Sequence, residues 1–292
     1  MEIAASIISE AIGTTLSDEK LSFRSLALSS QSRPGSLSFL DDVRYAAELK
    51  TNDSIIAVFC DASLKNTVEL SNKMPVVVDD PRWAFYSLHN FLAEKTDFYG
   101  QKFPTRVAPS AVISPFAMID DFGVEIAEKV VVHAGASIYS GTSIGAESII
   151  GPSSSVGVQG FEYKRTKRGV LRVAHDGGVK LGRQVEVGAG AAIAKGFLGR
   201  DTVVGDQVKI DNLVHIAHNC VVGEGSFIIA TAMIGGSVIV GKNVWVGPGA
   251  KIRNGLRLGD SSFIGIGACV VKHVEAGDTV AGNPARIFAG KS

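Results

Sequence analysis

A six-residue repeat constrains this chain more than any other feature. Every sixth residue is aliphatic in the series Val204, Ile210, Ile216, Val222, Ile228, Ile234, Val240, Val246, Ile252, Leu258, Ile264 and Val270. The same spacing runs through residues 126–156, and shorter runs cover 107–119 and 181–193. A period of six fits neither an α-helix, with about 3.6 residues per turn, nor a single strand, with a period of about two. It predicts a parallel β-helix, in which three hexads make one triangular coil.

The composition agrees with a narrow β-helix. The chain has 292 residues, of which 33 are glycine and only 7% are aromatic. The hexad aliphatic residue fills the interior, the fifth residue is small or β-branched near a corner, and Gly or Asn takes the tight turns. A core this narrow has no room for large aromatic side chains. We expect about five coils over residues 181–270 and nearly three over 107–156.

Residues 1–100 lack the repeat and predict a small α/β domain. Strand-like apolar runs alternate there with helical patterns, at 55–60 and 75–78 for strands and 43–49 and 81–92 for helices. Pro81 follows two aspartates and suits the first turn of a helix. A linker is expected near residues 94–103.

The expected domains are the α/β domain at 1–100, the β-helix at 101–280 and a short tail at 281–292. Two segments interrupt the repeat. Residues 157–180 have no hexad register and hold five basic residues between Lys164 and Arg172, which indicates a loop extruded from the β-helix. Around residues 197–201 the chain is one residue short of register, which indicates a local irregularity.

Charge and cysteine content exclude several classes of protein. With 29 Lys+Arg against 29 Asp+Glu, the balance argues against a nucleic-acid partner. No run of about 18 apolar residues predicts a transmembrane segment. The N-terminal stretch carries Glu2 without a basic region, so no secretory signal is expected. The three cysteines are far apart and form neither a disulfide framework nor a zinc signature, and we expect a cytoplasmic protein with no metal.

The register singles out one histidine. His218 is the third residue of its hexad, at a turn, and Gly236 occupies the same position one coil later. A neutral imidazole can take a proton from an attacking nucleophile, and a glycine N–H can donate to the oxyanion of a tetrahedral intermediate. Stacked about 5 Å apart, the two would bracket a thioester carbonyl. The alternative is that His218 is a solvated turn residue.

Three segments carry a resemblance to a known family. Residues 210–219, with Ala-His-Asn in hexad register, are similar to the catalytic segment of UDP-3-O-(3-hydroxyacyl)glucosamine N-acyltransferases. These enzymes of the left-handed β-helix hexapeptide acyltransferase superfamily catalyse the third step of lipid A synthesis. Residues 157–163 resemble the family's GFxY loop, and residues 37–45 resemble its uridine-binding N-terminal domain.

The resemblance implies a left-handed β-helix and a homotrimer with active sites between subunits. It also implies His218 as general base, the Gly236 amide as oxyanion donor, Phe39 stacking on the nucleotide base and Tyr45 contacting the nucleotide. We assign further residues to substrate binding, namely Asp42, His215 and Asn219. Two residues of the GFxY loop are assigned to the acyl donor, Phe161 and Tyr163.

The chain departs from the family at three places. Asp42 stands where the family has Asn, and Leu256 stands where it has a phosphate-contacting His. The family continues into a helical extension that engages acyl carrier protein, whereas this chain stops at Ser292. Its ending over residues 281–286 resembles CoA-dependent hexapeptide acetyltransferases, in which the GNPA turn lies beside the cofactor. We therefore assign to the donor Gly282, Pro284 and Arg286, or else this turn only caps the chain.

The leading hypothesis is an enzyme, an N-acyltransferase acting on the amine of a nucleotide-linked amino sugar. Its donor is a thioester of acyl carrier protein or coenzyme A, used as a co-substrate with no permanently bound cofactor. The alternatives are a CoA-dependent acyltransferase on another nucleotide amino sugar of a surface polysaccharide pathway, an O-acyltransferase, or a non-catalytic trimeric scaffold. The basic segment 164–172 either binds the donor's acidic groups or is a solvated loop.

Overall fold

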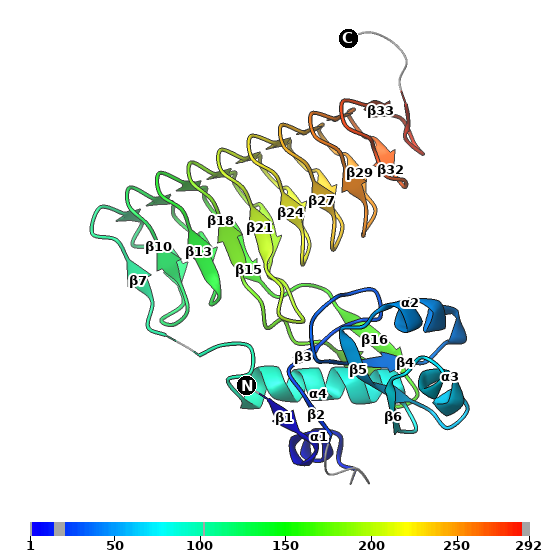
Figure 1. Ribbon diagram of the computed structural model, residues 1–292. Helices are drawn as coiled ribbons and strands as arrows, with labels where there is room; N and C mark the ends of the chain where they lie inside the picture. The colour runs from blue at the N-terminus through cyan, green and yellow to red at the C-terminus, as the bar shows by residue number, and fades with distance from the viewer. Residues whose placement is uncertain (1, 15–20, 102, 288–292) are drawn as a thin grey trace. The chain divides into compact units, whose positions relative to one another are not determined.

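The computed structural model describes residues 2–14, 21–101 and 103–287, and it divides into two compact units (Figure 1). The N-terminal unit comprises Met1–Gln101 and Glu162–Ala174, and the β-helix unit comprises Lys102–Phe161 and His175–Ser292. Within the described ranges, no helix combines the length and apolar character needed to cross a membrane.

Three parallel sheets form the β-helix unit (Figure 1). The first contains β7 (Arg106–Val107), β10 (Glu125–Ile126), β13 (Thr142–Ile144), β18 (Val179–Leu181), β21 (Thr202–Val204), β24 (Val221–Val222), β27 (Ile239–Val240) and β30 (Arg257–Leu258). The second contains β8 (Val112–Ile113), β11 (Val131–Val132), β14 (Ile149–Ile150), β19 (Glu186–Val187), β22 (Lys209–Ile210), β25 (Phe227–Ile228), β28 (Trp245–Val246), β31 (Phe263–Ile264), β33 (Thr279–Ala281) and β34 (Arg286–Ile287). The third contains β9 (Met118–Ile119), β12 (Ser137–Ile138), β15 (Ser155–Val158), β20 (Ala192–Ala194), β23 (His215–Ile216), β26 (Met233–Ile234), β29 (Lys251–Ile252) and β32 (Cys269–Val270).

The hexad residues stack as the repeat predicts. Ile216 pairs with Ile234 and Ile234 with Ile252, and all three are fully buried. The strand residue before each of them points outward, because successive side chains of a strand alternate. Eight-stranded first and third sheets correspond to three coils before the excursion at 157–180 and five after it, which confirms the expected coil count.

Glycines serve two separate needs in the coils. The turn itself falls on the fourth hexad residue, where Asn219, Ser237 and Gly255 have φ values of 59°, 60° and 74°. The glycine directly after the aliphatic residue has another reason. A Cβ built on Gly235 would lie only 2.6 Å from the backbone N of Asn254, one coil away. These glycines therefore allow close stacking of coils and do not form the turn, which differs from the sequence-based expectation.

The second interruption of the repeat is an insertion, not a missing residue. Leu181 pairs with Val204, a separation of 204 − 181 = 23 residues, whereas Val204 and Val222 occupy successive coils 18 apart. The coil thus carries 23 − 18 = 5 extra residues, around Phe197. From Ile193 to Val204 the chain advances 11 residues, which equals both 12 − 1 and 6 + 5, and the sequence alone does not distinguish the two.

The segment predicted as an extruded loop contains an ordered hairpin. Strands β16 (Tyr163–Thr166) and β17 (Gly169–Arg172) pair antiparallel and belong to the N-terminal unit. Lys167 N–H donates to Asp80 Oδ2 at 2.6 Å, and the Arg168 guanidinium carbon lies 3.8 Å from the Trp83 ring centroid. These anchors lie more than 80 residues away in sequence, so a local pattern does not reveal them.

The N-terminal unit is built on a four-stranded parallel sheet, β3 (Ser25–Leu26), β4 (Ser36–Leu40), β5 (Ile55–Cys60) and β6 (Met74–Val77). The helical elements are α1 (Ala5–Ile12), η1 (Val43–Tyr45), α2 (Ala46–Thr51), α3 (Lys65–Glu69) and α4 (Pro81–Lys95), and β1 (Ile3–Ala4) pairs with β2 (Ser22–Phe23). The α/β character agrees with the prediction. Asp80 caps α4 by accepting from Trp83 N–H, and α4 continues to Lys95, into the expected linker.

The predicted tail begins in ordered structure. β33 and β34 pair antiparallel, with Ala281 opposite Arg286. The cap is joined to the third sheet, because Cys269 N–H donates to the Gly282 carbonyl at 2.9 Å and Ala285 N–H donates to the Cys269 carbonyl at 2.8 Å. Residues 288–292 of the predicted tail lie outside the described residues.

Candidate active site

The structure brings His218 and Gly236 into direct contact. A Cβ built on Gly236 would lie 2.5 Å from Cε1 and 2.6 Å from Nε2 of His218, so only glycine leaves room for the ring. The neighbouring amides of Gly236 are engaged, since Gly235 N–H donates to Ile252 and Ser237 N–H to His218. Among the described residues, the N–H of buried Gly236 has no acceptor. A half-buried imidazole therefore lies beside an unsatisfied amide donor.

Two further rings surround His218, and the sequence reasoning missed their role. The Phe197 ring lies 5.0 Å from the imidazole, centroid to centroid, and His175 lies 5.9 Å from it. Both side chains are only 5% exposed. Phe197 comes from the five-residue insertion and His175 from the end of the excursion, so the breaks in the repeat were the signal that could have found them.

Asn219 and His215 flank the same turn in different ways. Asn219 is 5% exposed, and its Oδ1 accepts from Phe197 N–H at 2.8 Å. This amide thus fixes the insertion. His215 projects outward from β23, and desolvation, followed by the charge of nearby His218, lowers the pKa of His215. His215 is therefore neutral at pH 7.

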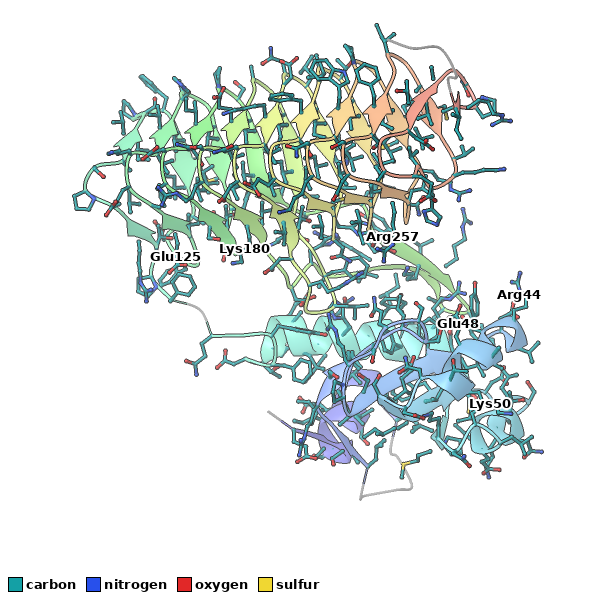
Figure 2. All side chains as sticks on the ribbon, turned by 45° about the horizontal axis from the view of Figure 1, so that its top comes forward. Arg44, Glu48, Lys50, Glu125, Lys180 and Arg257 are labelled. Atoms are coloured by element: carbon teal, nitrogen blue, oxygen red, sulfur yellow. The ribbon has the colours of Figure 1, made fainter. Side chains whose placement is uncertain are left out.

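The N-terminal unit contains a pocket of about 370 Å³ that is lined by Phe39 and Tyr45. Buried Tyr86 lies beside Phe39, at 5.7 Å between ring centroids. Further lining residues are Leu28, Ser29, Ser30, Asp41, Glu48, Arg82 and Lys164. The pocket thus combines aromatic side chains with carboxylates and cations, and Figure 2 labels Glu48 on this unit.

The charged residues of this pocket are largely paired. Asp41 Oδ2 accepts from Arg82 Nε at 2.7 Å. Lys164 Nζ lies 2.6 Å from Glu162 Oε1 and 4.8 Å from the Tyr86 ring centroid. Lys164 comes from the hairpin, so part of the segment expected as a loop completes the pocket wall.

Asp42 occupies a different position from the one expected of a ligand contact. It caps η1, where its carboxylate accepts from Arg44 N–H at 2.9 Å and from Arg44 Nε at 2.8 Å. The side-chain hydrogen bond of Arg44, with the backbone bond second, lowers the pKa of Asp42. Among the described residues, Asp42 is not part of the pocket lining.

The residues assigned to the acyl donor are spread over the chain. Phe161 is 88% exposed and Tyr163 is 45% exposed. Gly282 and Pro284 belong to the exposed turn before β34, and Arg286 is exposed on that strand. This turn is joined to Cys269, whose strand lies three coils beyond His215, so the structure does not bring it to His218.

Leu256 is buried inside the β-helix, with only 3% exposure. Its position points into the core, so it has no contact with a ligand at the surface. Within the ranges that the structure describes, no group of three His, Cys, Asp or Glu side chains is arranged to hold a metal ion.

Cations gather at the corner between the third and first sheets in the last coils. We call this set the basic corner, and its members are Lys251, Arg253, Arg257 and Lys272. All four are exposed, and none forms an ion pair with another described residue. The carboxylates of the same coils lie at a different corner, on Glu224, Asp260 and Glu275. Figure 2 labels Arg257 together with Glu125 and Lys180, which belong to strands of the same first sheet.

Comparison with known proteins gives the family. No protein-family model matches the chain. It is 34% identical over 262 residues to the UDP-3-O-acylglucosamine N-acyltransferase of Helicobacter pylori (strain HPAG1), covering 81% of this chain and 75% of the relative. The chain belongs to the UDP-3-O-acylglucosamine N-acyltransferase family. The relative of that name from Coxiella burnetii (strain Dugway 5J108-111) is 31% identical over 262 residues, covering 79% of this chain and 73% of the relative.

Other members of the UDP-3-O-acylglucosamine N-acyltransferase family match more strongly over a shorter segment. UDP-3-O-acylglucosamine N-acyltransferase 2 of Legionella pneumophila (strain Paris) is 48% identical over 130 residues, which is 44% of this chain and 38% of the relative. Over that match the chain spans well under half the length of the Legionella relative.

Solved structures support the same fold for this family member. The UDP-N-acetylglucosamine acyltransferase of Campylobacter jejuni has a TM-score of 0.53 and 25% identity, covering 63% of this chain and 74% of that one. LpxA of Bacteroides fragilis 9343, a UDP-N-acetylglucosamine acyltransferase, has a TM-score of 0.50 and 20% identity, with coverage of 63% and 74%. The fold is the left-handed β-helix that the sequence predicted.

A Gly236→Ala substitution is expected to displace the His218 ring, because the new Cβ would lie 2.5 Å from Cε1. The matched control is Gly265→Ala, whose Cβ would meet its nearest neighbour at 3.2 Å. Proton–carbon NMR spectra of the imidazole groups test this, with the His218 signal assigned by its loss in His218→Ala. We expect that signal to shift in Gly236→Ala and to stay in Gly265→Ala. An unchanged signal in Gly236→Ala would contradict the described contact.

Proposed function

We propose that this protein transfers an acyl group from a thioester to the amine of a UDP-linked 3-O-acylglucosamine, as its relatives' names describe. The observation that carries the proposal is the contact between the His218 imidazole and the unsatisfied N–H of Gly236. Acyl transfer needs both groups, a base for the amine proton and a donor for the oxyanion.

In the proposed mechanism, the sugar amine attacks the thioester carbonyl and His218 accepts the amine proton. Gly236 N–H donates a hydrogen bond to the oxyanion of the tetrahedral intermediate. Collapse of this intermediate breaks the C–S bond, and the protonated His218 returns its proton to the thiolate. The products are an amide and a free thiol, and no bound cofactor takes part. His218 stays near neutral in the resting enzyme, as general-base catalysis near pH 7 requires.

We propose that the nucleotide base of the acceptor binds in the pocket of the N-terminal unit. Its aromatic walls support this, because Phe39 and Tyr45 offer ring faces to a flat base. The paired carboxylates and cations of the pocket suit hydrogen bonding to the base and ribose better than binding of the charged diphosphate.

The proposed donor is a thioester on a phosphorylated pantetheine arm, which acyl carrier protein and coenzyme A share. The basic corner supports this proposal. Gly236, Asn254 and Lys272 follow His218 at the same turn position in successive coils, which puts Lys272 about 14 Å from the level of His218 at the usual strand spacing. The corner therefore offers unpaired cations to a phosphate at the far end of an extended arm. The hairpin cations are less suitable, since Lys164 and Lys167 already have partners.

We also propose a homotrimer that acts in the cytoplasm. An exposed aromatic row on the second sheet supports self-association, because its rings are 37–44% exposed along adjacent coils, at Phe227, Trp245 and Phe263. The three cysteines are free thiols, which is consistent with a reducing compartment.

His218→Ala is expected to lower kcat by about 10²–10⁴-fold, the usual contribution of a general base. The measurement is steady-state release of thiol from the acyl thioester in the presence of the acceptor. The matched control is His133→Ala, which removes an exposed histidine of the same unit and should leave kcat unchanged. Unchanged turnover in a correctly folded His218→Ala protein would sink the base assignment and favour the scaffold alternative.

Removing two cations of the basic corner, in Arg253→Ala/Lys272→Ala, should raise the KM for the thioester donor by about tenfold and flatten its salt dependence. The assay compares acyl carrier protein and CoA thioesters in parallel. Whichever donor shows the change uses the basic corner, and Lys180→Ala on the first sheet provides a control of equal charge change. An unchanged KM for both donors would contradict this assignment.

A further inference from the structure

The two breaks in the repeat meet at one residue. The other coils after β18 keep an 18-residue length, and only the excursion at 157–180 and the insertion around Phe197 depart from the hexad register there. Each break supplies one ring to the surroundings of His218, namely His175 and Phe197. In a β-helix built from equal coils, such a convergence points to a shared purpose.

Backbone hydrogen bonds join the two irregular segments. Gly199 N–H, in the insertion, donates to Asp176 Oδ2 at 2.6 Å. Gly177 N–H, at the end of the excursion, donates to the Gly196 carbonyl at 3.1 Å. The segments therefore form one support, which neither would provide separately.

This support is attached to the turn that carries the base. Asn219 follows His218 directly, and its Oδ1 accepts from Phe197 N–H at 2.8 Å. A Cβ on Gly196 would lie 2.6 Å from the same oxygen, so this glycine allows the close approach. Any shift of the insertion would thus be transmitted to the residue next to His218.

His175 is held from the opposite direction. A Cβ on Gly160 would lie 2.5 Å from His175 Nε2, so the glycine-rich turn packs against this ring. His175 also contacts Phe197, at 5.4 Å between ring centroids. With 5% exposure each, the two rings are shielded from solvent and pack against His218 rather than facing a substrate.

We propose that His175 and Phe197 are positioning residues for His218. They confine its imidazole between their rings and the Gly236 backbone, so that one orientation of the base is available for proton transfer. This inference rests on the proposed function, in which His218 is the base. General-base catalysis requires hydrogen-bond reach to the proton, and a misplacement of about 1 Å can cost about 10²-fold in rate.

The first test compares kcat with KM. His175→Ala and Phe197→Ala should each lower kcat by about 10–100-fold, while KM for both substrates stays within about twofold of the wild type. His175→Phe keeps a ring at this position and should retain most of the activity. His133→Ala is the histidine control. Circular dichroism checks that each variant keeps its β-sheet content.

A double-mutant cycle separates positioning from general support of the fold. If His175 acts through His218, then His175→Ala should cause no further loss of kcat in a His218→Ala background. An equal loss in both backgrounds would overturn the inference, because the effect would not pass through the base. So would a His175→Phe variant as impaired as His175→Ala. A wild-type protein without acyl transfer would contradict the proposed function itself, and this inference with it.

Discussion

The in-register stacking of coils is the constraint on which the rest of this structure depends. Parallel strands lie about 4.8 Å apart, so residues 18 apart, such as Ile216 and Ile234, are neighbours along the β-helix. The turns inherit the same spacing. Ser237 N–H donates to the His218 carbonyl and Gly255 N–H to the Gly236 carbonyl, both at 2.9 Å. The base and the amide donor are thus held by the same ladder of hydrogen bonds that forms the fold.

A regular β-helix has little space for chemistry, because its side chains either fill a narrow core or project outward from flat faces. The chain obtains an enclosed imidazole by departing from the repeat at two places. The resulting rings shield His218, while Gly236 leaves one side of the imidazole open to the backbone. The regular coils therefore supply a rigid frame, and the irregular segments shape the surroundings of the base.

The repeat made most of the β-helix predictable. Its aliphatic residues recur many times, so their register, the coil count and the meeting of His218 with Gly236 follow from simple counting. In the N-terminal unit, the long apolar run of β5 was predicted with its observed bounds, whereas short elements such as α1 and α3 have too few residues for a clear period.

What the sequence did not reveal depends on distant contacts. The hairpin is ordered by Asp80 and Trp83, which no local pattern connects to Lys167 and Arg168. Likewise, the length of the insertion at Phe197 becomes clear only from the pairing of Leu181 with Val204. Asp42 was expected at the ligand, yet a local Asp–Arg pair at a helix start uses its carboxylate.

The most direct test of the account is the identity of the product. The purified wild-type protein is incubated with UDP-3-O-acylglucosamine and an acyl thioester of carrier protein or coenzyme A, and the product is analysed by tandem mass spectrometry. The account predicts one added acyl group in an amide that survives mild alkali, released together with one equivalent of thiol. An alkali-labile ester on a sugar hydroxyl, or an unconsumed thioester with both donors, would contradict it.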